Sequence, residues 1–310
     1  MDIAKRIQLV VDRSANSKNA TDQAVKMAKE LNAKLSSLYV VNTHMHKTPN
    51  VIKAMVRTGK KQLMTIKETA SNMKININTS TVLVGGPTND ILKETKSNQA
   101  DLLIIGAGEN SPKGSVPGKL IRKAKCNLLL VRSNPSIRDF SKILVLTNDI
   151  ELDRAPLFAA NMAKRYSAEL TACYVVDVEQ AMIKDRIVYL QEASNCNIAS
   201  MPYRTLGEKV PISPTLLDKL NTDQINEGYR IMDTVARIAK DAGVDVDVNS
   251  VILKGKPAEE IIRFAEKGDF DLIVMEHSSR SKFSQLLLGS IPEKVARNAS
   301  CSVMIVNRAS

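Results

Sequence analysis

Aromatic residues are scarce in this chain of 310 residues: they make up 4% of the sequence, and tryptophan is absent. Nucleic-acid-binding domains usually concentrate their basic residues in a patch or stripe. This chain has a formal net charge of +11, but its Lys and Arg residues are scattered along both halves. The composition therefore disfavours a nucleic-acid partner, and a diffusely basic, well-solvated surface is the simpler interpretation.

Cysteine is scarce as well, with four residues and no Cys-x-x-Cys pair. Cys126 and Cys301 occupy corresponding places ahead of two similar apolar runs, which favours small buried packing residues in a reducing compartment. No apolar run reaches membrane-spanning length, and Met1 to Arg6 lead straight into a predicted strand without the apolar core of a signal peptide. We therefore expect a cytoplasmic protein without a membrane partner.

Familiar catalytic motifs are missing too. The sequence has no Gly-x-Ser-x-Gly elbow, no Walker lysine loop and no His-Glu-x-x-His helix. No nucleophile can be paired with a general base, so we expect no catalytic residues and at most weak ATP hydrolysis. His44 and His46 share a loop without identifiable Cys or carboxylate partners, which favours a solvated loop over a metal site.

What the chain does contain is a repeat. The corresponding segments are 35–41 and 170–176, 101–105 and 271–275, and 114–119 and 289–294. A repeated order of elements predicts two similar lobes, which we place at 1–134 and 141–310 with a boundary near Pro135. The second lobe carries an extra segment at 179–211, which is either a surface excursion or a cover over a cleft.

Apolar runs alternate with amphipathic stretches throughout the chain. In the first half this predicts strands at 7–11, 38–41, 81–84, 102–105 and 128–131, and helices at 20–31, 52–73, 88–97 and 116–124. Apolar strands separated by helices are typical of a parallel sheet covered on both faces. The predicted fold is α/β, with two tandem doubly wound, Rossmann-like domains. Ligands of such sheets bind beyond the carboxyl ends of the strands, here after Val11, Val41 and Ile105.

A glycine-serine pair precedes a predicted helix in both halves, as Gly114-Ser115 and Gly289-Ser290. Free amides at a helix start attract anions, and glycine lets the backbone approach a phosphate closely. Plain helix capping is the alternative, since Ser290 and Glu293 form a capping-box pattern. Capping alone is the simpler interpretation of one such pair, and repetition at corresponding positions strengthens the anion interpretation.

The segments 255–261, 284–295 and 299–301, together with the repeat, resemble the universal stress protein family and its tandem members. The resemblance covers almost the whole chain. It implies a stress-response role and binding of ATP, ADP or AMP. Whether Mg²⁺ accompanies the nucleotide stays open. It also implies that the last strands, 126–131 and 301–306, pair edge to edge about a pseudo-twofold axis, so that one chain mimics a dimer. Whether two chains form a homodimer stays open.

The resemblance assigns the site residues. They are Asp12 near the adenosine, Val40 and Val41 at the base, and Gly106, Gly108, Gly114 and Ser115 at the phosphates, with Gly289 and Ser290 as the second-half counterparts. The first phosphate loop is several residues shorter than the family's. The second has full length but holds Glu276 and Ser279 in place of two glycines, and Asn148 in place of Asp12.

A glutamate beside a polyphosphate adds like-charge repulsion, which we expect to cost about 1–3 kcal/mol. The sequence therefore favours the first half as the nucleotide site. The alternative is a nucleotide-free scaffold, or an apolar-ligand-binding protein, that acts through protein contacts. A phosphoryl-transfer enzyme on a related sheet is a third possibility, but its sequence motif is missing.

Overall fold

The structure is a computed structural model of the chain. It describes residues 3–108, 115–132, 140–147, 154–177, 214–244, 248–277 and 291–307, with only the backbone described for 214–221. The predicted insertion at 179–211 and most of the segment between the lobes lie outside these residues. Within the described part, no helix is both long and apolar enough to cross a membrane.

Strands and helices alternate in both halves, as predicted. The first half comprises β1 (Arg6–Val11), α1 (Asn16–Leu31), β2 (Lys34–Asn42), α2 (Pro49–Asn72), β3 (Ile77–Gly85), α3 (Pro87–Ser97), β4 (Leu102–Gly106), α4 (Val116–Lys123) and β5 (Asn127–Val131). The second half comprises β6 (Lys142–Leu146), α5 (Arg154–Tyr166), β7 (Glu169–Val176), α7 (Pro214–Asp241), β8 (Asn249–Lys254), α8 (Pro257–Lys267), β9 (Leu272–Glu276), α9 (Ile291–Asn298) and β10 (Ser302–Val306).

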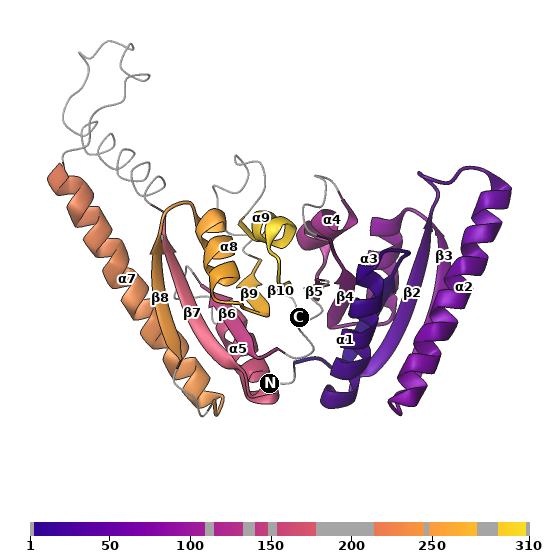
Figure 1. Cartoon of the computed structure of the whole chain (residues 1–310), viewed down its shortest axis with the longest axis horizontal. Helices are drawn as coiled ribbons and strands as arrows, with labels where there is room; N and C mark the ends of the chain where they lie inside the picture. Colours follow the sequence, from indigo (N-terminus) through magenta and orange to yellow (C-terminus); the bar gives the residue numbers. More distant parts are fainter. Residues whose placement is uncertain are drawn as a thin grey trace, which may run out of the picture.

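The described strands form one continuous sheet in the order β3-β2-β1-β4-β5-β10-β9-β6-β7-β8. Pairing is parallel within each half, whereas β5 and β10 pair antiparallel, with Leu129 opposite Met304. Each half is thus a doubly wound sheet, and the two halves join through their last strands, as predicted. Figure 1 shows the halves side by side, with α2 and α7 at the outer ends and α4 and α9 next to one another in the middle.

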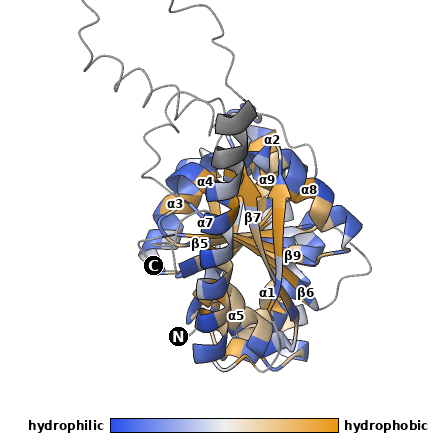
Figure 2. Ribbon diagram, turned by 90° about the vertical axis from the view of Figure 1, so that its left-hand side faces the viewer, coloured by the Kyte–Doolittle hydropathy of each residue, from blue (hydrophilic) through white to orange (hydrophobic). Residues whose placement is uncertain are grey.

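Two apolar layers hold the sheet between its helices. One face packs against α1, α2, α5 and α7, and the other against α3, α4, α8 and α9. The central strands are buried on both faces, which explains their nearly uninterrupted apolar sequences. Figure 2 shows this distribution, with hydrophobic strands in the interior and hydrophilic outer helix faces. Cys126 and Cys301 lie in the second layer, 7% and 3% exposed, which confirms the prediction of small packing residues.

Two strands are longer than predicted. β2 begins at Lys34 instead of Leu38, and β3 begins at Ile77 instead of Thr81. The addition to β2 carries two serines and that to β3 a threonine and a serine, which weaken the apolar strand pattern. The ladder continues nevertheless, and the hydroxyls of Ser37 and Ser80 bond across it at 2.7 Å.

The repeated aspartate ahead of β4 and β9 anchors the start of a neighbouring strand. The Asp101 carboxylate accepts hydrogen bonds from the backbone N–H groups of Lys5 and Arg6 at 3.0–3.3 Å. Asp271 does the same for Ser141 and Lys142, at 2.8 Å to both amides. Both aspartates therefore fix the register between the first and fourth strands of their half.

We expect Asp101→Ala to destabilise the chain by about 1.5 kcal/mol, because a carboxylate that bonds two backbone donors is lost and those donors must find other partners. Urea unfolding of the full chain measures this free energy. Asp101→Asn, which keeps an acceptor, should recover part of the loss. A stability of Asp101→Ala equal to that of the native chain would contradict the anchoring role.

Side chains from both halves cross the seam between β5 and β10. The Arg132 amide donates to Ser302 Oγ at 3.3 Å, and in the pseudosymmetric position the Asn307 amide donates to Asn127 Oδ1 at 3.0 Å. An ion pair adds to the seam: Arg122 Nη1 on α4 lies 2.8 Å from Oε2 of Glu293 on α9. This pair has no pseudosymmetric mate, because α4 carries Gly118 where α9 carries Glu293.

Gly118→Glu should supply that mate by pairing with Arg297, the counterpart of Arg122 on α9. The nearest atom that an added Cβ at Gly118 would meet is Ser115 Oγ at 3.7 Å, so the first side-chain carbon fits. We expect the free energy of unfolding to rise by about 1 kcal/mol, from better helix propensity and one ion pair. Gly118→Ala is the control for propensity alone. If adding Arg297→Ala does not remove the extra gain of Gly118→Glu, the pair does not form.

Candidate functional site

The carboxyl ends of β1, β2 and β4 lie at one edge of the first half. Val11 pairs with Tyr39 and Val10 with Ile105, so the three parallel strands end side by side. Asp12 follows β1 directly, and Gly106 closes β4. The sheet therefore brings the sequence-predicted Asp12, Val41 and Gly106 to one edge, while Gly114, Gly289 and Ser290 lie outside the described residues.

Asp12 organises the turn between β1 and α1. Its Oδ1 accepts hydrogen bonds from the amide of Ser14 at 2.8 Å and from the hydroxyls of Ser14 and Ser17 at 2.6 Å. Gln62 of α2 donates to the Asp12 carbonyl at 2.9 Å. Among the described residues, none donates to Oδ2, and the residue is exposed. The turn thus fixes the carboxylate through one oxygen and leaves the other for a ligand donor.

The two predicted valines of β2 face opposite sides of the sheet. Val41 is 1% exposed and belongs to the layer beneath α1 and α2, so only its backbone remains at the site. Val40 is half-buried on the other face, and its partner in the ladder is Leu83 of β3, also half-buried on that face. Val40 and Leu83 form an apolar platform, of which the sequence analysis identified only the valine.

Gly106 lies against the first residue of α1. A Cβ added at Gly106 would come within 2.6 Å of the backbone carbon and oxygen of Asn16. At Gly108 an added Cβ would lie 3.3 Å from Asn16 Nδ2. The absence of a side chain at Gly106 therefore lets the end of β4 contact the amino end of α1.

Arg132, a residue that the sequence analysis missed, ties this loop to the other half. It follows β5 and is 4% exposed. Its Nη1 donates to the carbonyl of Ala107 at 2.9 Å and to that of Gly108, while its Nη2 donates to the carbonyl of Ala296 near the end of α9. The last carbonyls of a helix lack intrahelical partners and carry partial negative charge, so a guanidinium suits them.

The same contact orients the loop backbone. In a planar trans peptide the carbonyl and the next N–H point to opposite sides. Because Arg132 draws the Ala107 carbonyl toward itself, the N–H of Gly108 points away from it. Arg132 thus fixes the orientation of the peptide between Ala107 and Gly108.

Two helices of the first half begin near this loop without acidic residues. Ser115 is the N-cap of α4, its side chain makes no capping bond, and the first turn of α4 carries no Asp or Glu. The first turn of α1 has none either. The positive amino-terminal end of the α4 dipole therefore faces no carboxylate of its own first turn, which favours a bound anion, whereas the Asp12 carboxylate, bonded to Ser17, already lies at the amino end of α1.

The second half differs at the equivalent edge. Glu276 pairs with Val306 as Gly106 pairs with Val131, and the amide of His277 donates to the Val306 carbonyl at 3.0 Å, as the amide of Ala107 does to Val131. A half-buried glutamate thus occupies the position of Gly106. Asn148 and Ser279 lie outside the described residues.

Metal and thiol chemistry find little support in the described part of the chain. There, no three or more His, Cys, Asp or Glu residues gather closely enough to hold a metal ion. His44, in the loop after β2, lies over Gly86. Burial raises the pKa of Cys126 to about 11 and the pKa values of Cys173 and Cys301 to about 12, so these three thiols stay protonated at neutral pH. The arrangement is suited to binding an anion beside an apolar platform.

Comparison with known proteins supports the fold described above. The model of the universal stress protein family matches residues 4–132 and 206–307. A universal stress protein of Methanocaldococcus jannaschii is 32% identical over 171 residues, covering 54% of this chain and 83% of that protein. One of Bacillus subtilis is 26% identical over 168 residues, covering 54% and 99%. The crystal structure of a universal stress protein from Archaeoglobus fulgidus covers 99% of this chain and 97% of that chain at 17% identity, with a TM-score of 0.66, and shows a similar fold.

Proposed function

The chain belongs to the universal stress protein family, and from that premise we propose that it is a cytoplasmic stress-response regulator that binds an adenine nucleotide in its first half. The observation that carries the proposal is the Gly106–Gly108 backbone, held between the amino end of α1 and the buried guanidinium of Arg132. Two other universal stress proteins have been solved as complexes, one with cAMP and one with dAMP.

The phosphates would lie at this loop. The amino end of α4 supplies partial positive charge without a carboxylate in its first turn. Ser115, whose side chain is not used for capping, offers a hydroxyl. Mg²⁺ would be carried by the nucleotide's own phosphates, which are its usual ligands at nucleotide sites.

The adenosine would lie across the ends of β1 and β2. Asp12 presents Oδ2 as an acceptor for a ribose hydroxyl, while Val40 and Leu83 offer apolar contact to the base. The backbone of Val41 at the end of β2 supplies further hydrogen-bonding groups. Recognition of the base through a strand end and of the phosphates through a loop matches the general placement of ligands in doubly wound sheets.

Glu276 supports the choice of the first half. A carboxylate at the position of Gly106 both fills the space that the backbone needs and repels a phosphate. The role we propose is regulatory binding, in which occupancy of the loop is sensed through Arg132 by α9 of the second half. A catalytic role would require a positioned nucleophile and base.

Asp12→Ala should weaken nucleotide binding about tenfold to a hundredfold, because a charged acceptor of ligand hydrogen bonds is lost. Isothermal titration of the native chain and the variant with AMP, ADP and ATP measures the change.

Ser14→Ala is the matched control, since it loosens the same turn but keeps the carboxylate. If Ser14→Ala weakens binding as much as Asp12→Ala does, Asp12 orders the turn without contacting the ligand. Native protein that binds none of the three nucleotides would refute the proposal.

A further inference from the structure

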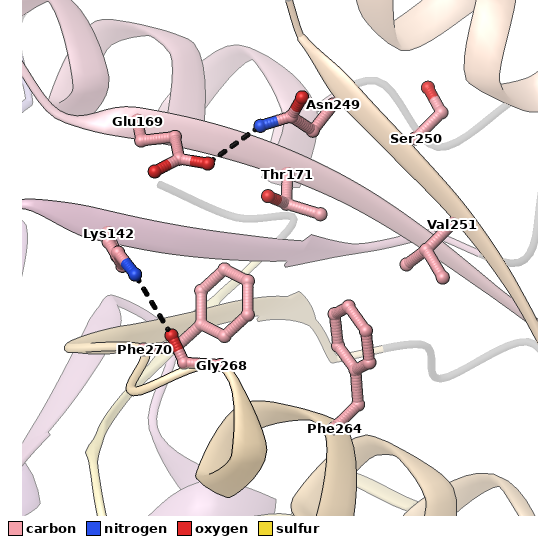
Figure 3. Close-up of a pocket in the computed structure, with 9 residues that line it drawn as sticks. All are labelled: Lys142, Glu169, Thr171, Asn249, Ser250, Val251, Phe264, Gly268 and Phe270. Carbon is pink, nitrogen blue, oxygen red and sulfur yellow. Dashed lines mark hydrogen bonds between the residues drawn. The ribbon is translucent and has the colours of Figure 1, made fainter.

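A pocket of about 420 Å³ lies in the second half, away from the candidate nucleotide site. It is lined by the first residues of β6, β7 and β8, which are Lys142, Glu169 and Asn249, and by the end of α8 (Figure 3). These are the amino ends of the strands, whereas the nucleotide site lies at the carboxyl ends. Pockets of this volume suit small organic ligands.

Two phenylalanines form the apolar wall of the pocket. Phe264 of α8 is half-buried and Phe270 is 8% exposed, and their ring centroids are 5.6 Å apart with the planes tilted by 35°. Figure 3 shows both rings directed toward the strands that close the other side. A flat ring placed against them would gain aromatic contact and bury apolar surface.

Two hydroxyl side chains line the pocket, Thr171 and the exposed Ser250. Thr171 of β7 is 5% exposed and lines the pocket. Among the described residues, none forms a hydrogen bond with its side chain. A ligand group that donates to or accepts from this hydroxyl would satisfy it, since a hydroxyl can do both.

The charges at the pocket mouth cancel. Lys142 Nζ donates to the Gly268 carbonyl at 3.3 Å, and Glu169 accepts from Asn249 Nδ2 at 2.7 Å. Figure 3 shows these pairs on opposite sides of the opening. One cation and one anion, both engaged and exposed, give an uncharged ligand the advantage over a charged one.

The first half lacks this pocket wall, although the fold is the same. Helices α3 and α8 start at corresponding prolines, which makes Glu94 the counterpart of Phe264 and Asn98 that of Gly268. In the first half Asn98 Nδ2 donates to Gln8 Oε1 at 2.8 Å, and Thr81 donates to Glu94 Oε1 at 3.2 Å. In the described residues a polar network thus stands where the second half has Phe264, so the aromatic wall is specific to the second half.

From these observations we infer that the second half binds an uncharged small aromatic molecule that carries one hydrogen-bonding group, with its ring against Phe264 and Phe270 and its polar group at Thr171.

The test is a titration of the full chain with indole, followed by indole fluorescence, because the chain contains no tryptophan. We expect saturable binding that phenol competes with and that benzoate and benzylammonium do not. Saturating AMP should leave the indole titration unchanged, which separates this pocket from the nucleotide site.

Two variants locate the binding. Phe264→Glu, which installs the residue of the first half, should weaken indole binding at least about tenfold by removing a ring and placing a carboxylate in the pocket. Thr171→Val keeps the shape and should weaken it about threefold to tenfold. Glu94→Gln in the first half is the control and should change nothing. If Phe264→Glu does not fold, Thr171→Val carries the test alone.

Indole binding that is unchanged in both pocket variants, or that benzoate displaces better than phenol, would overturn the inference. A linear response without saturation for every probe would overturn it as well.

Discussion

Gly106→Ala should destabilise the chain by about 1–3 kcal/mol and remove measurable nucleotide binding. The added methyl group would come within 2.6 Å of backbone atoms of Asn16, which cannot move without shifting the start of α1. That helix packs its buried alanines, among them Ala20 and Ala24, against the sheet. Overpacking against backbone costs about this much, and the shift moves the loop away from the helix end. Urea unfolding and nucleotide titration measure the two effects.

Gly118→Ala is the matched control for this substitution. Gly118 is the third residue of α4, and an added Cβ there makes only an ordinary contact with Ser115 Oγ at 3.7 Å. We expect it to stabilise the chain by about 0.5–1 kcal/mol. The same chemical change thus has opposite signs at two glycines. A native-like stability for Gly106→Ala would show that the β4 end and α1 are not in contact.

Arg132→Met should have the largest effect on stability, about 3 kcal/mol. The substitution keeps much of the side-chain volume but leaves the carbonyls of Ala107, Gly108 and Ala296 without their guanidinium donor in a buried place. Nucleotide affinity should fall as well, because the loop is no longer drawn toward the seam. Urea unfolding reports the first effect and titration with AMP the second.

Arg132→Lys distinguishes positioning from charge. Lysine keeps the positive charge but lacks the planar fork that reaches two sides at once. We expect most of the stability loss and of the affinity loss to remain. If Arg132→Lys restores nucleotide affinity fully while Arg132→Met does not, charge near the phosphates matters, and the orientation of the loop backbone does not.

The fold could be predicted from the sequence because its signals are local and repeated. Apolar strand runs, the helical spacing between them and the duplicated segments predict the element order, and the structure confirms it. The edge-to-edge pairing of β5 with β10 came from the family resemblance and is confirmed too. Strand lengths were underestimated where serines and threonines continue the ladder, because cross-strand hydrogen bonds replace apolar burial there.

Contacts between distant residues could not be predicted. The repeat contains Tyr39 and Tyr174, but only the structure shows that each ring packs on a helix glycine, Gly59 or Gly228. The repeated aspartates were visible in the sequence, but their role in anchoring β1 and β6 was not.

The candidate site was predictable only in part, because some of its residues act through contacts with distant parts of the chain. The residues that follow strands, Asp12 and Gly106, have a local signal, whereas Leu83 reads as an ordinary strand residue. Arg132 contacts a loop more than twenty positions earlier and a helix more than 160 positions later. No local pattern marks it. The ligand-binding roles of all the predicted site residues stay predictions, and Gly114, Gly289 and Ser290 also lie outside the described residues.

The central claim is that one nucleotide binds per chain, in the first half. Native mass spectrometry of the full chain, titrated with AMP, ADP or ATP, tests it most directly. The account predicts a mass increase of one nucleotide that saturates and that Asp12→Ala reduces. Two nucleotides per chain, or none with any of the three, would contradict it.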